Sequence, residues 1–329
     1  SDLFPKRALI CQSYLYDLIS NLEDSNEKKL LFFAFTSNLA NCSKLVPPIT
    51  SRGDMAQGAW MTGFYIGETY LENNVFHYFD NRVKKIIKGK KDFLSLANKK
   101  ATYKITCNDA KKLDIADNSI DFVFTDFPYG DTVPYFEQSQ IWNLWLKKDV
   151  DYENEIVVSD SKARNKNQDS FSVDIDKAIS EIYRVLKPEK YFTFTFHSLN
   201  GEEWEAISNS IQKNMFEFID FKFLIQKTFT PRQLNRKFSI KGDLVVTYKK
   251  VTSKQMKLDF NNINDKIKNE IKSVCKKDVL YDTNELIILC VKCLLKYNRI
   301  AHKTDFTELI REYFNLDEQN SKWKLKDNI

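Results

Sequence analysis

The sequence predicts an α/β fold, in which a mostly parallel sheet is covered by helices, with helical extensions at both ends of the chain. Between residues 101 and 250, short apolar runs bounded by turn residues alternate with amphipathic stretches at helical spacing. Such alternation is typical of strands that are joined by helical crossovers. With 43% hydrophobic residues among 329, the chain can also bury a substantial core.

We therefore expect a helical lead-in region (1–100), an α/β region (101–250) and a C-terminal helical region (251–329). In the lead-in region, apolar residues at helical spacing predict two helices over residues 3–41, and a further helix is expected over 75–88. Prolines and glycines gather in the stretch between these helices, which predicts a loop there.

The α/β region begins with the short strand YKITC and continues to a longer apolar strand, IDFVFTD, that ends in an acidic residue. Pro188 is expected to end the amphipathic helix VDIDKAISEIYRVLKP, because proline lacks the backbone donor that a helix needs. Strands are expected over residues 103–107, 120–126, 191–196, 216–226 and 243–250. Helices are expected over residues 141–146, 173–188, 201–214, 285–297 and 305–314.

The sequence indicates neither a membrane protein nor a metal site. No apolar run approaches the roughly 20 residues that span a bilayer, and no signal peptide opens the sequence. Among six cysteines, only Cys290 and Cys293 form a C-x-x-C pair, inside the apolar run LIILCVKCLLKY. Without a second pair or a nearby histidine, this spacing favours core packing on a helix over metal or redox chemistry. Free thiols suit a reducing compartment, so a cytoplasmic protein is expected.

The net charge of +5 says little by itself, but its distribution is informative. Residues 82–91 contain six basic residues and no acid, and residues 227–241 contain five basic residues and no acid. Clusters of this kind suit contact with nucleic-acid phosphates. For the first run, a solvated helix face remains an equal alternative. Trp142 and Trp145, three positions apart on an expected helix, favour core packing over base stacking.

The strand expected over residues 120–126 ends at an acidic residue that begins a short motif: Asp126, Phe127, Pro128, Tyr129 and Gly130. In open parallel sheets, ligands bind outside the carboxyl ends of the strands, where this motif is expected to lie. It resembles the D-P-P-Y motif of S-adenosylmethionine-dependent methyltransferases that modify exocyclic amino groups. The resemblance implies S-adenosylmethionine as the cofactor and a Rossmann-like methyltransferase sheet. It implies catalytic roles for four residues: Asp126, Phe127, Pro128 and Tyr129.

The chemistry of an amino group explains these residue types. An exocyclic amine on a base is a poor nucleophile, because its lone pair is delocalised into the ring. The resemblance implies that the Asp126 carboxylate and the main-chain carbonyl of Phe127 accept the two N–H bonds and free that lone pair. The ring of Tyr129 then offers a face on which an extrahelical base can stack.

The segments around the motif resemble the same family in order along the chain. Upstream, residues 107–131 resemble the family's passage from its third to its fourth motif. This implies cofactor contacts from Asp109, Ala110 and Asp126. Further segments resemble the adenine-specific branch of bacterial DNA methylases: the weaker lead-in match over 3–90, then 135–147, 178–198 and 228–250. In that branch the last loop faces DNA, which implies nucleic-acid contacts from Arg232, Arg236, Lys237 and Lys241.

The sequence departs from the family pattern in two places. Phe127 stands where the motif has proline, so the fixed φ of proline is missing from the loop. The family's cofactor loop also needs closely spaced glycines, so that the backbone can approach the ligand. Here no two of the eight glycines lie within three positions of each other, and 251–329 contain none. We therefore expect an incomplete sheet, with the missing strands and glycine-rich loop supplied by an upstream segment or a partner polypeptide.

The sequence thus favours part or a subunit of an S-adenosylmethionine-dependent DNA methyltransferase, acting on adenine N6 in a modification or defence system such as restriction-modification. Two alternatives remain. One is a non-catalytic DNA-binding subunit of such a system, which the missing glycine loop supports. The other is an RNA guanine-N2 methyltransferase, whose T-D-P-P-Y-G signature continues with a basic residue where this chain has Asp131.

Overall fold

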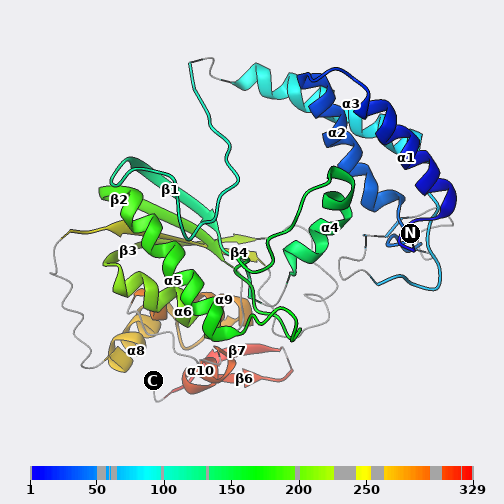
Figure 1. The fold of residues 1–329 in the computed structure, drawn as a ribbon. Helices are drawn as coiled ribbons and strands as arrows, with labels where there is room; N and C mark the ends of the chain where they lie inside the picture. The colour runs from blue at the N-terminus through cyan, green and yellow to red at the C-terminus, as the bar shows by residue number, and fades with distance from the viewer. Residues whose placement is uncertain are drawn as a thin grey trace. The chain divides into compact units, whose positions relative to one another are not determined.

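The computed structural model describes residues 2–49, 57–58, 60, 65–97, 100–130, 133–196, 201–225, 242–252, 263–296, 306–319 and 321–327. The chain packs as two compact units (Figure 1). Unit 1 comprises 1–106 and 134–152, and unit 2 comprises 107–133 and 153–329. A short segment from within the expected α/β region therefore packs with the lead-in helices. The three expected regions stay a prediction, because compact packing does not by itself define functional domains.

Unit 1 is helical, as the sequence predicts. Its helices are α1 (Lys6–Ser20), α2 (Asn26–Leu39), the 3₁₀ turn η1 (Ala40–Cys42), α3 (Val75–Leu96) and α4 (Tyr135–Leu146). The side chain of Ser25 caps α2 by accepting from the Lys28 amide at 3.2 Å. Asn74 caps α3 in the same way, by accepting from the amide of His77 at 3.1 Å. Such caps satisfy amide groups that have no partner within the helix.

Aromatic side chains build the core of unit 1. Phe35 is fully buried and its ring lies 5.3 Å, centroid to centroid, from that of Trp145. Trp142 packs against the same core and donates from its indole to the carbonyl oxygen of Thr36 at 3.0 Å. The prediction that both tryptophans are core residues is therefore confirmed.

Unit 2 contains the larger sheet, built from β1 (Ile120–Asp126), β2 (Leu186–Phe196), β3 (Phe216–Ile225) and β4 (Gly242–Lys250). The strands lie in the order β1-β2-β4-β3. β1 and β2 are parallel, whereas β4 is antiparallel to both of its neighbours. The described sheet is therefore mixed rather than mostly parallel. β3 and β4 follow one another along the chain and pair directly, so they run in opposite directions.

One face of this sheet carries the core of unit 2. Phe192, Phe194 and Phe196 alternate along β2 and are fully buried. They belong to one apolar cluster with residues of α5 (Gln168–Val185) and α6 (Gly201–Lys213), which lie side by side in Figure 1. The strand period of two places these phenylalanines on a single face, as the alternation in YFTFTF predicts.

The expected strand over 103–107 is absent. Residues 101–109 are described and contain no strand, and Tyr103 and Ile105 are 86% and 88% exposed. An isolated strand cannot satisfy its backbone donors and acceptors, so an apolar alternation without a neighbouring strand does not become β structure. β1, the next strand along the chain, pairs with β2 and with no other strand in the described part of the chain.

The C-terminal region holds more than helices. Its elements are α8 (Ile263–Val274), β5 (Leu280–Tyr281), α9 (Thr283–Lys296), α10 (Phe306–Tyr313), β6 (Phe314–Asp317) and β7 (Lys322–Leu325). The short strands form an antiparallel sheet in the order β5-β7-β6, which the helical pattern of the sequence did not indicate. α9 buries Cys290 and Cys293 completely, and burial raises the pKa of the Cys293 thiol to about 12. Their predicted core packing on a helix is confirmed.

Among the helices that the structure describes, none combines the length and the apolar character needed to cross a membrane.

Candidate active site

The Asp126 carboxylate lies at the carboxyl end of β1 and is held by two hydroxyl groups. Thr195 Oγ1 donates to Asp126 Oδ1 at 2.6 Å, and Tyr129 Oη donates to the same oxygen at 2.8 Å. Thr195 stands directly opposite Asp126 in the parallel register of β1 and β2, so both side chains leave the same face of the sheet. Oδ2 has no hydrogen-bond partner among the described residues, and Asp126 is exposed. One carboxylate oxygen is thus fixed and the other is open to a ligand.

Phe127 anchors the loop that follows Asp126. Its side chain is buried, with ring centroids 5.1 Å from Phe194 and 6.1 Å from Phe192. Its amide donates to the carbonyl oxygen of Thr195 at 3.4 Å. Core packing therefore holds the loop at the position where the family's motif has a proline to fix φ. Hydrophobic packing of the Phe127 ring, in place of the fixed φ of a proline, therefore restricts this loop.

Tyr129 connects the loop to the sheet. Its ring lies 5.8 Å from the ring of Phe196 in a tilted arrangement, while its hydroxyl reaches Asp126. The ring is therefore held at one end by an aromatic contact and at the other by the carboxylate. Pro128, between Phe127 and Tyr129, is half-buried.

Gly130 closes the motif in a conformation that favours glycine. Its φ is +62°, in the left-handed region, and a Cβ built there lies 2.5 Å from Glu203 Oε1. Glu203, at the start of α6, is buried against this glycine. The carbonyl oxygen of Gly130 also accepts from the amide of Val158 at 3.3 Å. Any other residue at position 130 would be strained by this φ, and its Cβ would force the buried Glu203 side chain to shift.

The structure does not join Asp109 and Ala110 to the Asp126 cluster. Asp109 lies in the exposed stretch before β1, where its carboxylate accepts from the amide of Lys111 at 2.9 Å. Lys111 Nζ lies 3.4 Å from the same carboxylate and donates to the carbonyl oxygen of Asn154 at 2.6 Å. No hydrogen bond or ion pair connects Asp109 with Asp126 within the described part of unit 2. Their shared role in cofactor binding stays a prediction.

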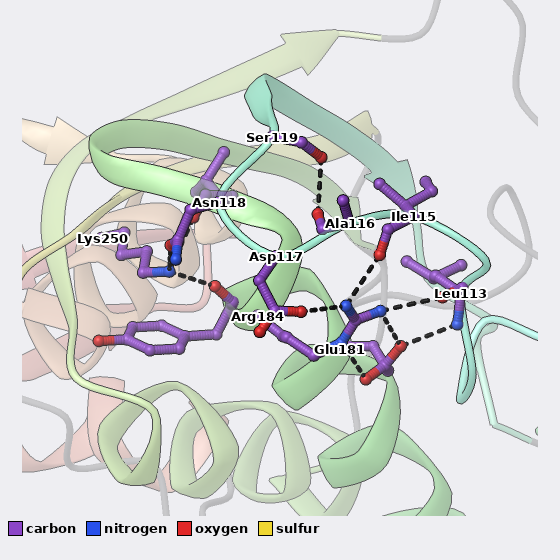
Figure 2. A network of polar contacts seen from close by, with 11 residues as sticks. Leu113, Ile115, Ala116, Asp117, Asn118, Ser119, Glu181, Arg184 and Lys250 are labelled. Carbon is purple, nitrogen blue, oxygen red and sulfur yellow. Dashed lines mark hydrogen bonds and ion pairs between the residues drawn. The ribbon is translucent and has the colours of Figure 1, made fainter.

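A polar network fixes the loop between Asp109 and β1 (Figure 2). Arg184 donates to the carbonyl oxygens of Leu113 and Ile115, at 2.9 and 2.8 Å, and to the carboxylate of Asp117. Glu181 accepts from Arg184 and from the amide of Leu113, at 2.8 Å in each case. The hydrogen bond from Arg184 lowers the pKa of the Glu181 carboxyl to about 2. The end of α5 therefore sets the path by which the chain enters β1.

Lys250 completes this network from the end of β4. It is buried, and its ammonium donates to Asn118 Oδ1 at 2.7 Å and to the carbonyl oxygens of Tyr183 and Leu186 at 2.6 and 2.7 Å. Burial lowers the pKa of the Lys250 ammonium. Three acceptors surround one cation, which offsets the cost of removing it from water.

Sequence reasoning located the motif but missed Thr195, Glu203 and the Arg184 network. Thr195 and Glu203 reach the motif only through strand register and helix packing, which no local pattern reveals. The basic residues Arg232, Arg236, Lys237 and Lys241 lie outside the described residues. Their predicted contact with nucleic acid stays a prediction.

No family model matches the chain, and no curated protein matches it. A SAM-dependent methyltransferase from Methanosarcina mazei is similar in structure, with 12% identity and a TM-score of 0.25, over 44% of this chain and 66% of that chain. A putative DNA modification methylase from Thermus thermophilus is similar with 12% identity and a TM-score of 0.27, over 50% of this chain and 60% of that one. Its complex with S-adenosyl-L-methionine is similar with 12% identity and a TM-score of 0.26, over 50% of this chain and 62% of that chain. The chain thus spans less than two thirds of each of these structures.

Proposed function

We propose that this chain is the amine-activating part of an S-adenosylmethionine-dependent DNA methyltransferase, with adenine N6 as its target. The observation that carries the proposal is the Asp126 carboxylate, fixed at the end of a parallel strand through Oδ1 and open at Oδ2. An acid in this position leans toward adenine over cytosine, following the motif that the sequence resembles.

The residues around Asp126 perform one task in this proposal. Oδ2 accepts one N–H of the exocyclic amine, and the carbonyl oxygen of Phe127 accepts the other. With both hydrogens held out of the ring plane, the nitrogen moves toward tetrahedral geometry and its lone pair becomes available for attack. Because Thr195 and the buried ring of Phe127 set these acceptors in advance, little reorganisation accompanies the reaction.

Tyr129 receives the base without giving up its hydrogen bond to Asp126. The target base must leave the helical stack, which costs a few kcal/mol that the pocket has to offset. The Tyr129 hydroxyl donates to Oδ1, so a base stacked on the tyrosine ring, with its amine on Oδ2, leaves that bond in place. The same contact therefore orients the stacking ring and the carboxylate together.

The described residues do not fit S-adenosylmethionine on their own. A cofactor cradle needs backbone that approaches the ligand closely, which closely spaced glycines permit. Gly130 is the glycine nearest to Asp126 in sequence, and the space at its Cα is filled by Glu203. We therefore assign the cradle of the cofactor to a further polypeptide segment.

The edge of β1 supports such a segment. Phe122 and Phe124 lie on one face of β1, the face of Asp126, and are 54% and 59% exposed. Large apolar side chains on an unpaired strand edge are a liability that proteins normally cover. The unpaired alternation over 101–109 lies just upstream. Both features are accounted for if a segment carrying the glycine-rich turn adds a strand beside β1 and also covers this face of the sheet.

The decisive experiment is Asp126→Ala in the completed enzyme, assayed by transfer of a labelled methyl group from S-adenosylmethionine to DNA. Removing one preorganised acceptor of the reacting amine is expected to lower the rate by roughly 10²–10³. Glu23→Ala, at an exposed position in unit 1, is the matched control. Circular dichroism checks that both variants fold. Near-normal transfer by Asp126→Ala excludes the assignment, and transfer to structured RNA in place of DNA selects the RNA alternative.

A second candidate function is a non-catalytic DNA-binding subunit, favoured by the missing glycine cradle. It predicts no transfer under any condition, and no difference between wild-type protein and Asp126→Ala in DNA binding.

A further inference from the structure

The basic run over residues 82–91 lies on α3, beside an open groove of about 440 Å³. The groove is lined by His77, Tyr78, Asn81, Arg82, Lys84, Lys85 and Lys88. At 100° per residue these positions fall on one side of a helix. The opposite side carries Val75 and Phe79, which pack into the core of unit 1. Tyr78 lies at the boundary, because it lines the groove and also packs against this core.

Three of the cations in this groove have no carboxylate partner. Lys84 is paired with Asp80 at 2.6 Å, but Arg82, Lys85 and Lys88 form no ion pair within the described residues. The Nε of Arg82 is buried and has no hydrogen-bond partner there either. The side chains of Lys85 and Lys88 are exposed, so an anion in the groove can reach both charges.

The spacing of these cations suits an extended polyanion rather than a compact one. From residue 77 to residue 88 the groove runs about 16 Å along the helix axis. A DNA strand rises about 3.4 Å per nucleotide, so this length matches on the order of four to five nucleotides. Tyr78 and Asn81 line the same groove, but the Tyr78 hydroxyl donates to Gln57 Oε1 at 2.6 Å and Asn81 Nδ2 lies 3.0 Å from His77 Nε2. Contact with phosphate oxygens therefore falls to the cations.

We propose that this α3 groove binds the phosphodiester backbone of nucleic acid, with Arg82, Lys85 and Lys88 each facing a phosphate. The groove belongs to unit 1, whereas Asp126 belongs to unit 2. The inference rests on the proposed function only in taking DNA as the substrate. It does not depend on methyl transfer, so binding is measured in the Asp126→Ala background.

The test measures binding of the full chain to a fluorescent duplex by anisotropy over a series of salt concentrations. Lys85→Gln with Lys88→Gln removes two exposed cations from the groove. The matched control, Lys6→Gln with Lys148→Gln, removes two exposed cations of unit 1 that do not line it. Each lost phosphate contact reduces the slope of log K against log salt by about 0.9, so the groove variant is expected to lose about 1.8 and the control nothing.

Three outcomes overturn the proposal. The first is an unchanged slope in the groove variant, and the second is an equal change in the control, which would reflect net charge alone. The third is failure of the Asp126→Ala chain with its groove intact to bind duplex DNA while it binds vesicles of phosphatidylserine, which would make α3 a membrane-surface helix. Thermal melts followed by circular dichroism verify that both variants are folded. Anisotropy reports binding without catalysis, so an unchanged salt slope in the groove variant counts against this inference alone. Failure of the proposed function appears instead in the methyl-transfer assay.

Discussion

In the proposed reaction, the hydroxyl of Thr195 determines which oxygen of Asp126 a substrate can use. It donates to Oδ1 at 2.6 Å, and Tyr129 donates to the same atom, so Oδ2 is the oxygen left open to a ligand. A carboxylate that rotates freely presents either oxygen, and it loses conformational entropy each time a substrate binds. Thr195 touches no reacting atom in this scheme. It is a positioning residue, and it acts through Asp126.

Thr195→Val is therefore expected to lower kcat for methyl transfer roughly tenfold, because a hydrogen bond to a charged group contributes about 1.5 kcal/mol or more. The KM for DNA should change little. Thr193→Val on the same strand is the matched control, since the Thr193 hydroxyl pairs with Thr247 instead. Thr195→Ser should recover the rate. An equal loss in Thr193→Val, or no recovery with serine, would indicate a structural role.

The sequence alone identifies the residues of the motif, but not the residues that hold them in place. Asp126, Phe127 and Tyr129 are close neighbours in the chain, and their types follow from the chemistry of an amine. Thr195 lies far along the chain and meets Asp126 only through the parallel register of β1 and β2. Register depends on the whole sheet, so local pattern cannot supply it. The burial of Phe127, by contrast, shows how a residue that breaks the motif can still hold the loop.

Among the elements, α5 and β4 together hold the approach to β1. Arg184, Glu181 and Lys250 bind backbone and side-chain groups over residues 113–119, a stretch with no helix or strand before β1. The predicted helix end at Pro188 is three residues late, since α5 ends at Val185 and β2 begins at once. Lys250 satisfies carbonyl oxygens at this junction, which lets the helix end there without unpaired acceptors.

Glu181 makes this network sensitive to acid. Its pKa falls from 4.5 to about 2 in the folded chain, chiefly through the hydrogen bond from Arg184. A carboxyl whose folded pKa is depressed stabilises the fold above its unfolded pKa and loses that contribution as the pH falls through the folded value. We expect the stability of wild-type protein to decline between about pH 4.5 and 2, measured by urea unfolding, and Glu181→Gln to flatten that decline. A decline of the same steepness in Glu181→Gln would contradict the assignment.

The strand expected over 103–107 failed for a reason that only the sheet explains. Its alternating pattern is that of a strand, but Tyr103 and Ile105 are exposed and this segment pairs with no strand in the described part of the chain. An alternating pattern gives a segment a preference for β structure, but the segment forms a strand only when it pairs with a neighbouring strand. The strand prediction is therefore wrong, and the incomplete sheet stays a prediction.

For the whole molecule, the sequence and the structure point to the same gap. The wide spacing of the glycines predicts that the cradle for S-adenosylmethionine comes from another segment, and β1 leaves one edge without a strand in the described residues. Phe122 and Phe124 extend along the face on which Asp126 and Thr195 lie. A segment that covers these rings therefore lies beside the carboxylate, where the proposed reaction requires the methyl donor.

The chain alone is therefore expected to bind S-adenosylmethionine weakly or not at all by isothermal titration, and a segment with the glycine-rich turn should restore binding and methyl transfer together.

Phe122→Lys with Phe124→Lys should block that complementation while leaving the fold intact, because both rings are already largely exposed. Leu224→Lys, on β3 at the opposite end of the strand order and 52% exposed, is the matched control and should complement normally. Micromolar binding by the chain alone would place the cradle in its own residues. Equal complementation by the phenylalanine variant would remove β1 as the docking edge.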